Sequence, residues 1–206
     1  MKSYSQNLED LIALEYFGDY KGTLLEIGAN QGSMLSNSLL LIENDWDAIL
    51  VEPSSVFEQL KALHLTNMQV QCVNVAIGSK SGKMILHESL NHVPNGNDLA
   101  LVSSLDYNET EKWRKNGVTF KETEVDVITF KDFLEMYPAK FDFISIDCEG
   151  VDWEILQQID LNVVGCKLIC LEWNGNANFN MNYTRYCNSF GLYEIHRNNE
   201  NILYAK

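Results

Sequence analysis

The sequence has few basic residues for its acidic content. It holds 15 lysines and arginines against 29 aspartates and glutamates, and its formal net charge is −14. A surface with this charge repels phosphate backbones, so we expect no nucleic-acid partner. A neutral or cationic small molecule, or an uncharged glycan, fits such a surface better.

Signals for export, membrane insertion and metal binding by thiols are also missing. The first residues, MKSYSQNLEDL, contain no apolar signal core, and no run approaches the roughly 20 apolar residues that a spanning helix needs. We therefore expect a cytoplasmic protein with no membrane partner. The five cysteines form no CxxC pair, which is typical of reduced thiols in core strands and not of a zinc site.

The sequence does contain a regular alternation of apolar runs and helical patterns. Its 206 residues show no repeat, linker or low-complexity tract, which predicts a single domain over residues 1–206. Strands are predicted over 23–29, 47–53, 70–78, 141–147, 167–173, 192–197 and 201–206. Helices are predicted over 5–17 with Ser5 as its cap, 33–43, after a Ser55–Glu58 capping box, after Thr129, over 151–159 and near 177–189.

Strands that alternate with helices predict an α/β fold with a parallel sheet covered on both faces. The last two strands are joined by a short turn and can pair only as an antiparallel hairpin. A mostly parallel seven-stranded sheet with a C-terminal hairpin is the Rossmann-like layout of class I methyltransferases. Residues 88–124 interrupt the order with a polar segment, preceded by an added strand within 79–87 and carrying a Pro94–Gly96 turn and a helix near 108–116. We expect this insertion to cover the acceptor.

The loop after the first strand, EIGANQGS over residues 26–33, is the predicted cofactor site. In open α/β sheets the ligand lies at the carboxyl ends of the strands, where the strand order reverses. Gly28 and Gly32 let the backbone approach a ligand and let the next helix begin close to the strand, and Glu26 can accept a hydrogen bond from a cofactor amine. Asn30 replaces the middle glycine of GxGxxG, which favours S-adenosylmethionine, a ligand without phosphate, over a dinucleotide. The alternative is a plain strand–turn–helix whose glycines only allow tight packing.

The next two strand ends supply the rest of the predicted nucleoside site. Glu52 ends the second strand, where a carboxylate can accept both ribose hydroxyls. The third strand ends at Asn74, Val75 and Ala76, where the adenine edge would lie. A lone solvated glutamate at position 52 is the alternative.

Carboxylates gather after the fourth and fifth predicted parallel strands. Asp147 and Glu149 flank Cys148, and burying two acids there is costly unless they are paired or used in function. Glu172 ends the next strand along the chain. The three could converge on a divalent cation, or one could be the base that takes a hydroxyl proton. The alternative is that Asp147 caps the next helix and Glu149 is solvated.

Histidines and aromatic residues near the polar segment are weaker candidates. His92 could be a general base, although a loop histidine exposed to solvent is the simpler interpretation. Trp113, Trp173 and Tyr107 could line a sugar or aromatic acceptor, or simply pack.

Several of these segments resemble a known family. LEIGANQGS resembles the cofactor loop of FkbM-type methyltransferases, FDFISIDCEGVDWEIL resembles their later I-D-x-E-G signature, and YSQNLEDL resembles an S-Q-x-x-E-D segment in one branch. The matches follow in order over about residues 4–173. The segment 88–124 has no recognisable counterpart, so the acceptor stays open.

The resemblance implies S-adenosylmethionine as the donor and an oxygen as the acceptor, usually a hydroxyl of a sugar, glycan or small natural product. It places Asp147 and Glu149 in the active site as catalytic residues, and Gln6 and Asp10 where they help to close the cofactor pocket. The full set of predicted cofactor-binding residues is Gln6, Asp10, Glu26, Gly28, Ala29, Asn30, Gly32, Glu52, Pro53, Asn74, Val75, Ala76 and Asp147.

Two other functions are open at this point. A nicotinamide-dependent oxidoreductase or epimerase could use the same sheet, but it needs a GxGxxG loop and usually a Tyr/Lys pair, and neither is found. A non-catalytic nucleoside-binding domain is the second, and the joint presence of Glu26, Glu52, Asp147 and Glu149 argues against it.

Overall fold

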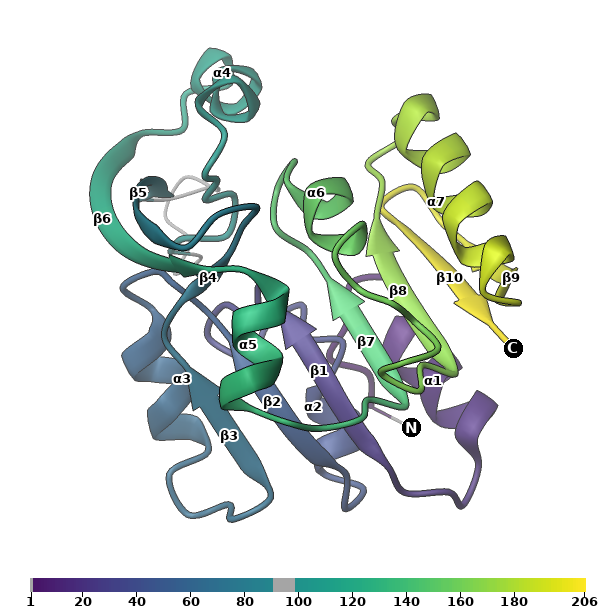
Figure 1. The fold of residues 1–206 in the computed structure, drawn as a ribbon. Coiled ribbons are helices and arrows are strands. Elements are labelled where there is room, and N and C mark those ends of the chain that lie inside the picture. The colour runs from purple at the N-terminus through teal and green to yellow at the C-terminus, as the bar shows by residue number, and fades with distance from the viewer. Residues whose placement is uncertain (1, 91–98) are drawn as a thin grey trace.

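The computed structural model describes residues 2–90 and 99–206. Seven strands form one sheet in the order β3-β2-β1-β7-β8-β10-β9 (Figure 1). They are β1 Thr23–Ile27, β2 Asp47–Val51, β3 Val70–Val73, β7 Phe143–Ile146, β8 Leu168–Glu172, β9 Tyr193–Arg197 and β10 Asn201–Ala205. The predicted Rossmann-like sheet is confirmed.

The strand order reverses beside β1. This strand pairs in parallel with β2 on one side and β7 on the other, so that Glu26 lies between Leu50 and Ser145. Strand β10 is antiparallel to both β8 and β9, as the short turn before it predicts. The carboxyl ends of β1, β2, β7 and β8 therefore meet at one edge, which is where ligands bind in such sheets.

Helices cover both faces of the sheet because neighbouring strand residues point to opposite sides. Leu24 packs with the helices of one face, whereas Leu25 packs with those of the other. The first group is α1 Glu9–Phe17, α2 Leu39–Ile42 and α3 Phe57–Leu63, and the second is α5 Phe130–Met136, α6 Asp152–Leu156 and α7 Ala177–Ser189. Figure 1 shows α5, α6 and α7 in front of the sheet, with α1 and α2 behind it.

A second, smaller sheet stands over the carboxyl edge at the top of Figure 1. Its order is β4-β6-β5, with β4 Ala76–Ile77, β5 Gly82–Ser89 and β6 Phe120–Ile128, and α4 Tyr107–Lys115 lies beside it. The added strand and the helix near 108–116 are thus confirmed. Strand β6 was not predicted, because its Lys and Glu residues are depleted in strands in general. The Pro94–Gly96 turn and His92 lie outside the described residues.

Two helices begin in a way that differs from the prediction. Helix α1 begins at Glu9, because Leu8 before it has a left-handed φ of 71°. Ser5 lies four residues before this start and is not the N-cap, although its hydroxyl accepts from the Asp10 N–H at 3.3 Å. Helix α3 has no side-chain cap, because the Ser55 hydroxyl donates to Glu88 of β5.

The predicted helix over 33–43 shrinks to α2, Leu39–Ile42. Residues 36–38 instead turn inward, and their polar groups reach the end of β1. None of the helices within 2–90 and 99–206 has the length and apolarity needed to cross a membrane.

The predicted start of α5 is confirmed and gives a test of the local analysis. Thr129 Oγ1 accepts a hydrogen bond from the Asp132 N–H at 3.1 Å. We expect Thr129→Ala to lower the free energy of unfolding by about 1 kcal/mol, the usual value of an N-cap, as measured by urea denaturation. Thr66→Ala, in an exposed turn, is the control, and equal stability of both variants would contradict the assignment.

Candidate functional site

A cavity of about 480 Å³ opens at the carboxyl edge of the large sheet, beneath the small one. Its walls come from the ends of β1, β2, β7 and β8, from the small sheet, and from two distant segments that carry Gln6 and Glu200. Most of the predicted site residues line it. They are Gln6, Glu26, Gly28, Ala29, Asn30, Glu52, Pro53, Val75, Ala76, Asp147 and Glu149.

Gly28 allows the ends of β1 and β7 to approach each other closely. Its φ is 89°, and a Cβ atom there would lie 1.8 Å from the Asp147 carbonyl oxygen. The Gly28 N–H donates to the Val51 carbonyl at 2.9 Å, so the residue joins the ends of three strands. Only glycine fits this position, both in conformation and in space.

Glu26 is buried and holds the loop that follows the predicted cofactor turn. Its Oε1 accepts from the Asn37 N–H at 3.1 Å, and its Oε2 accepts from the Ser38 hydroxyl. Burial raises the pKa of Glu26 to about 7, although these two hydrogen bonds oppose the shift. The same contacts draw residues 36–38 out of the helix that their spacing predicts.

Glu52 links the turns after β1 and β2. Its Oε2 accepts from the Asn30 N–H at 2.9 Å and its Oε1 from the Ser54 N–H at 2.7 Å. Burial raises the pKa of Glu52. A carboxylate has about four lone-pair sites, so two hydrogen bonds leave acceptor capacity for a ligand. Asn74 is not among the lining residues, because its amide donates to the Glu52 carbonyl at 2.8 Å.

Two other predicted cofactor residues also lie away from the cavity lining. Asp10 is fully buried and accepts from the Tyr4 N–H at 2.7 Å and the Ser3 hydroxyl at 2.6 Å, which fixes the N-terminal segment. Gly32 faces α3, where a Cβ atom would lie 2.5 Å from Leu60 Cδ1. Its role in the structure is close packing of the turn against a helix.

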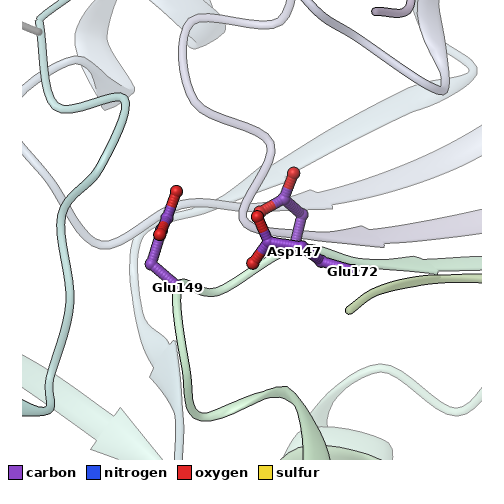
Figure 2. Close-up of side chains that lie close together, drawn as sticks. All are labelled: Asp147, Glu149 and Glu172. Carbon is purple, nitrogen blue, oxygen red and sulfur yellow. The ribbon is translucent and has the colours of Figure 1, made fainter. Parts of the chain in front are cut away.

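Asp147, Glu149 and Glu172 bring carboxylate oxygens within 4.8 Å of one another. Figure 2 shows Asp147 and Glu172 side by side, with Glu149 across from them. Burial and the neighbouring negative charges raise the pKa of Asp147 and of Glu172 well above their usual range. Burial raises the pKa of Glu149 to about 7. Such oxygen atoms are the donors that Mg²⁺ takes, and they can also accept a proton.

The loop that carries Glu149 is held from two sides. Asp152 accepts from the Cys148 N–H at 2.8 Å and the Gly150 N–H at 3.0 Å, so the start of α6 holds the loop. Helix α6 has no side-chain cap, so the alternative in which Asp147 caps it is wrong. Glu149 has a φ of 48°, and its carbonyl accepts from the Ser104 hydroxyl at 2.7 Å. This contact ties the carboxylate cluster to the covering segment.

The charge of the lining has one sign. Six of its side chains carry carboxyl groups, and none of the lining residues in the described part of the chain is Lys, Arg or His. These acids are Glu26, Glu52, Asp147, Glu149, Glu172 and Glu200. The nearest identified cation is Lys112 of α4, whose Nζ lies 3.8 Å from Glu149 Oε2. The cavity is therefore suited to a cationic ligand.

Two of the three predicted aromatic candidates lie elsewhere. Trp113 lines the cavity, whereas Tyr107 packs against His87 at 5.3 Å between ring centroids and the Trp173 indole donates to the Asn198 carbonyl at 2.9 Å. Glu200 was not predicted from the sequence, because nothing in the local pattern of its turn marks it as part of a site.

The close approach at Gly28 predicts a large loss of stability on substitution. Strain at a positive φ costs about 1–3 kcal/mol, and the clash with the Asp147 carbonyl adds to it. We therefore expect Gly28→Ala to destabilise the protein by more than about 3 kcal/mol in urea denaturation. Gly117→Ala is the matched control, since Gly117 has a φ of 88° and no atom within 4 Å of its Cβ position; similar losses in both would refute the role of the clash.

Buried Glu26 predicts a pH dependence of stability. Its folded pKa of about 7 lies above its usual value of 4.5, so the folded state keeps a proton that the unfolded state loses. This stabilisation is complete below about pH 4.5 and is lost as pH rises through 7. We expect Glu26→Gln to flatten the fall of the thermal midpoint between about pH 5 and pH 8, relative to wild type and to the exposed control Glu15→Gln. Parallel curves for all three would show that the Glu26 pKa is not raised.

Comparisons with known proteins agree with this geometry. A family model described as the Methyltransferase FkbM domain matches residues 26–196. A proposed RNA methyltransferase from Pyrococcus horikoshii aligns with a TM-score of 0.50 and 11% identity, covering 97% of this chain and 83% of its own. A proposed caffeoyl-CoA O-methyltransferase from Staphylococcus aureus aligns with a TM-score of 0.51 and 11% identity, covering 100% and 85%. At this identity the two structures show the fold alone. No protein of curated function matches the chain.

Proposed function

The chain belongs to the family of FkbM methyltransferase domains, and from this premise we propose that it transfers the methyl group of S-adenosylmethionine to a hydroxyl oxygen. The observation that carries the proposal is the carboxylate-lined cavity at the switch point of the sheet. S-adenosylmethionine carries a sulfonium and an ammonium group, and both are favoured by such a lining. Family membership also favours this function over a nicotinamide-dependent enzyme.

In the proposed arrangement the cofactor lies along the carboxyl edge. Glu52 accepts the ribose hydroxyls with the lone pairs that Asn30 and Ser54 leave available. The adenine lies toward Val75 and Ala76, which line the cavity beside the end of β3. The methionine part then crosses Gly28 in the direction of β7.

Methyl transfer needs alignment and a proton acceptor. The acceptor oxygen attacks the methyl carbon, the bond from that carbon to sulfur breaks, and the electron pair goes to sulfur to leave neutral S-adenosylhomocysteine. The protein has to align the oxygen with the methyl group and exclude water. Of the two predicted bases, Glu149 is the better candidate, because a general base works best with a pKa near the operating pH and burial raises its pKa to about 7.

The acceptor is proposed to be an uncharged or cationic hydroxyl compound, such as a sugar, glycan or small natural product. Six carboxyl groups and no basic side chain line the described part of the cavity. A phosphate or carboxylate on the acceptor would be repelled by Asp147, Glu149 and Glu172, which lie where the acceptor has to bind. The two similar structures, named for an RNA and a CoA thioester, do not set the acceptor at 11% identity.

Calorimetric titration of the wild-type protein tests the cofactor. We expect S-adenosylhomocysteine to bind and NAD to give no heat. Glu52→Gln should weaken S-adenosylhomocysteine at least about tenfold, since a hydrogen bond to a charged group contributes about 1.5–3 kcal/mol. Absence of binding at millimolar S-adenosylhomocysteine would refute the proposed function.

Methyl transfer from labelled S-adenosylmethionine to a library of hydroxyl compounds tests the base. Glu149→Gln should lower turnover by about 10²–10⁴-fold, the usual contribution of a general base, with cofactor affinity within a few-fold of wild type. Asp147→Asn, measured in parallel, separates the two carboxylates. If EDTA abolishes turnover and Mg²⁺ restores it, the three carboxylates hold a divalent cation, which is the alternative use of the same donors.

A further inference from the structure

The N-terminal segment and the turn between β9 and β10 together form one wall of the cavity. Gln6 and Glu200 both line it, although they stand at opposite ends of the sequence. Asn7 joins the two segments, because its Nδ2 donates to Glu200 Oε2 at 2.6 Å. The wall lies beside the end of β8, since Glu172 and Asn174 line the cavity with it.

A single carboxylate, that of Glu9, holds this wall together. Glu9 is fully buried. Its Oε1 accepts from Asn198 Nδ2 at 2.7 Å and from Asn201 Nδ2 at 2.9 Å, and its Oε2 accepts from the Asn7 N–H at 2.8 Å. Burial raises the pKa of Glu9, but these hydrogen bonds outweigh it and leave the pKa below its usual value. The carboxylate therefore stays ionised and accepts from both segments.

The turn is also bound to β8. The Trp173 N–H donates to the Glu200 carbonyl at 2.7 Å, and the Trp173 indole donates to the Asn198 carbonyl at 2.9 Å. The backbone of Glu200 is thus held by Trp173, directly after β8, and its side chain is held by Asn7 of the N-terminal segment. A side chain held in this way is preorganised for a ligand.

The position of the wall along the sheet indicates which part of a ligand it meets. Glu52 follows β2 and Glu200 precedes β10, and the strands β1, β7 and β8 lie between them. Four strand spacings of about 4.8 Å separate the two positions by roughly 19 Å. The part of such a ligand from the ribose hydroxyls to the amino-acid end, together with the two glutamate side chains and their hydrogen bonds, can bridge this gap if both side chains reach inward.

We propose that Gln6 and Glu200 bind the amino-acid end of S-adenosylmethionine, and that Glu9 is the positioning residue that holds them in place. The Gln6 amide can donate to the α-carboxylate, and the Glu200 carboxylate can accept from the α-ammonium group. No Lys or Arg lines the described part of the cavity to bind the α-carboxylate instead. The inference rests on the proposed function, since it assumes the same cofactor.

Two ligands that differ only at the amino-acid end test the proposal. S-adenosylhomocysteine has this end, whereas methylthioadenosine keeps the adenosine and the sulfur but lacks it. By calorimetric titration, Glu200→Gln should weaken S-adenosylhomocysteine about tenfold and change methylthioadenosine less than twofold. A general disturbance of the cavity would weaken both ligands alike.

The positioning role of Glu9 is tested with the same pair of ligands. Glu9→Gln should also weaken the binding of S-adenosylhomocysteine about tenfold, while its affinity for methylthioadenosine should stay within twofold of wild type. Asn7→Ala is the milder variant if Glu9→Gln folds poorly, because it removes the contact with Glu200 and keeps those of Glu9 with Asn198 and Asn201. Glu15→Gln, exposed on the same helix, is the control and should bind both ligands as wild type does.

The outcomes separate this inference from the proposed function. Equal losses for the two ligands, or no loss for either, would overturn the role of the wall while wild-type binding of S-adenosylhomocysteine still supports the function. Failure of the wild-type protein to bind S-adenosylhomocysteine would overturn both.

Discussion

The parallel pairing of β1 with β2 and β7 is the constraint on which the rest of the site depends. It brings the ends of three neighbouring strands together, and with them the carboxylates of Glu26, Glu52 and Asp147. The approach is close enough that Gly28 has no room for a Cβ atom beside the Asp147 carbonyl. The site is thus a consequence of strand order and of one glycine, and the loops around it are built onto that edge.

Burying so many carboxylates has an energetic cost that the protein meets in several ways. Part of the cost is offset by hydrogen bonds, as between Glu52 and the N–H groups of Asn30 and Ser54. The rest appears as raised pKa values at Glu26 and Glu149, both about 7. A cationic ligand would lower this energetic cost by pairing with the buried carboxylates, so ligand binding and protein stability are linked in this cavity.

The sequence predicted the parts of the fold that depend on local pattern. Helix α7 was predicted near 177–189 and lies at Ala177–Ser189, where the Asn176 side chain caps it by accepting from the Asn178 N–H. The sheet followed from short apolar runs that alternate with helices. The shortened helix α2 was not predictable, because a tertiary contact from Glu26 to residues 36–38 overrides the local spacing.

The candidate site was likewise predictable where it depends on local pattern and not where it depends on tertiary contacts. Residues directly after strands, such as Glu52 and Asp147, were found because parallel strands end at one edge. Asp10, Gly32 and Asn74 were also predicted to bind the cofactor, but they do not line the cavity. They contact the N-terminal segment, α3 and the Glu52 carbonyl instead. Glu200 was missed because its contact with Asn7 spans 193 positions in the sequence, and no local periodicity reports such a pairing.

A crystal structure of the complex with S-adenosylhomocysteine is the most direct test of the central claim. We expect the ribose on Glu52, the sulfur between Gly28 and the Asp147–Glu149 loop, and the amino-acid end against Gln6 and Glu200. A ligand bound elsewhere, or one whose ribose turns away from Glu52, would contradict it.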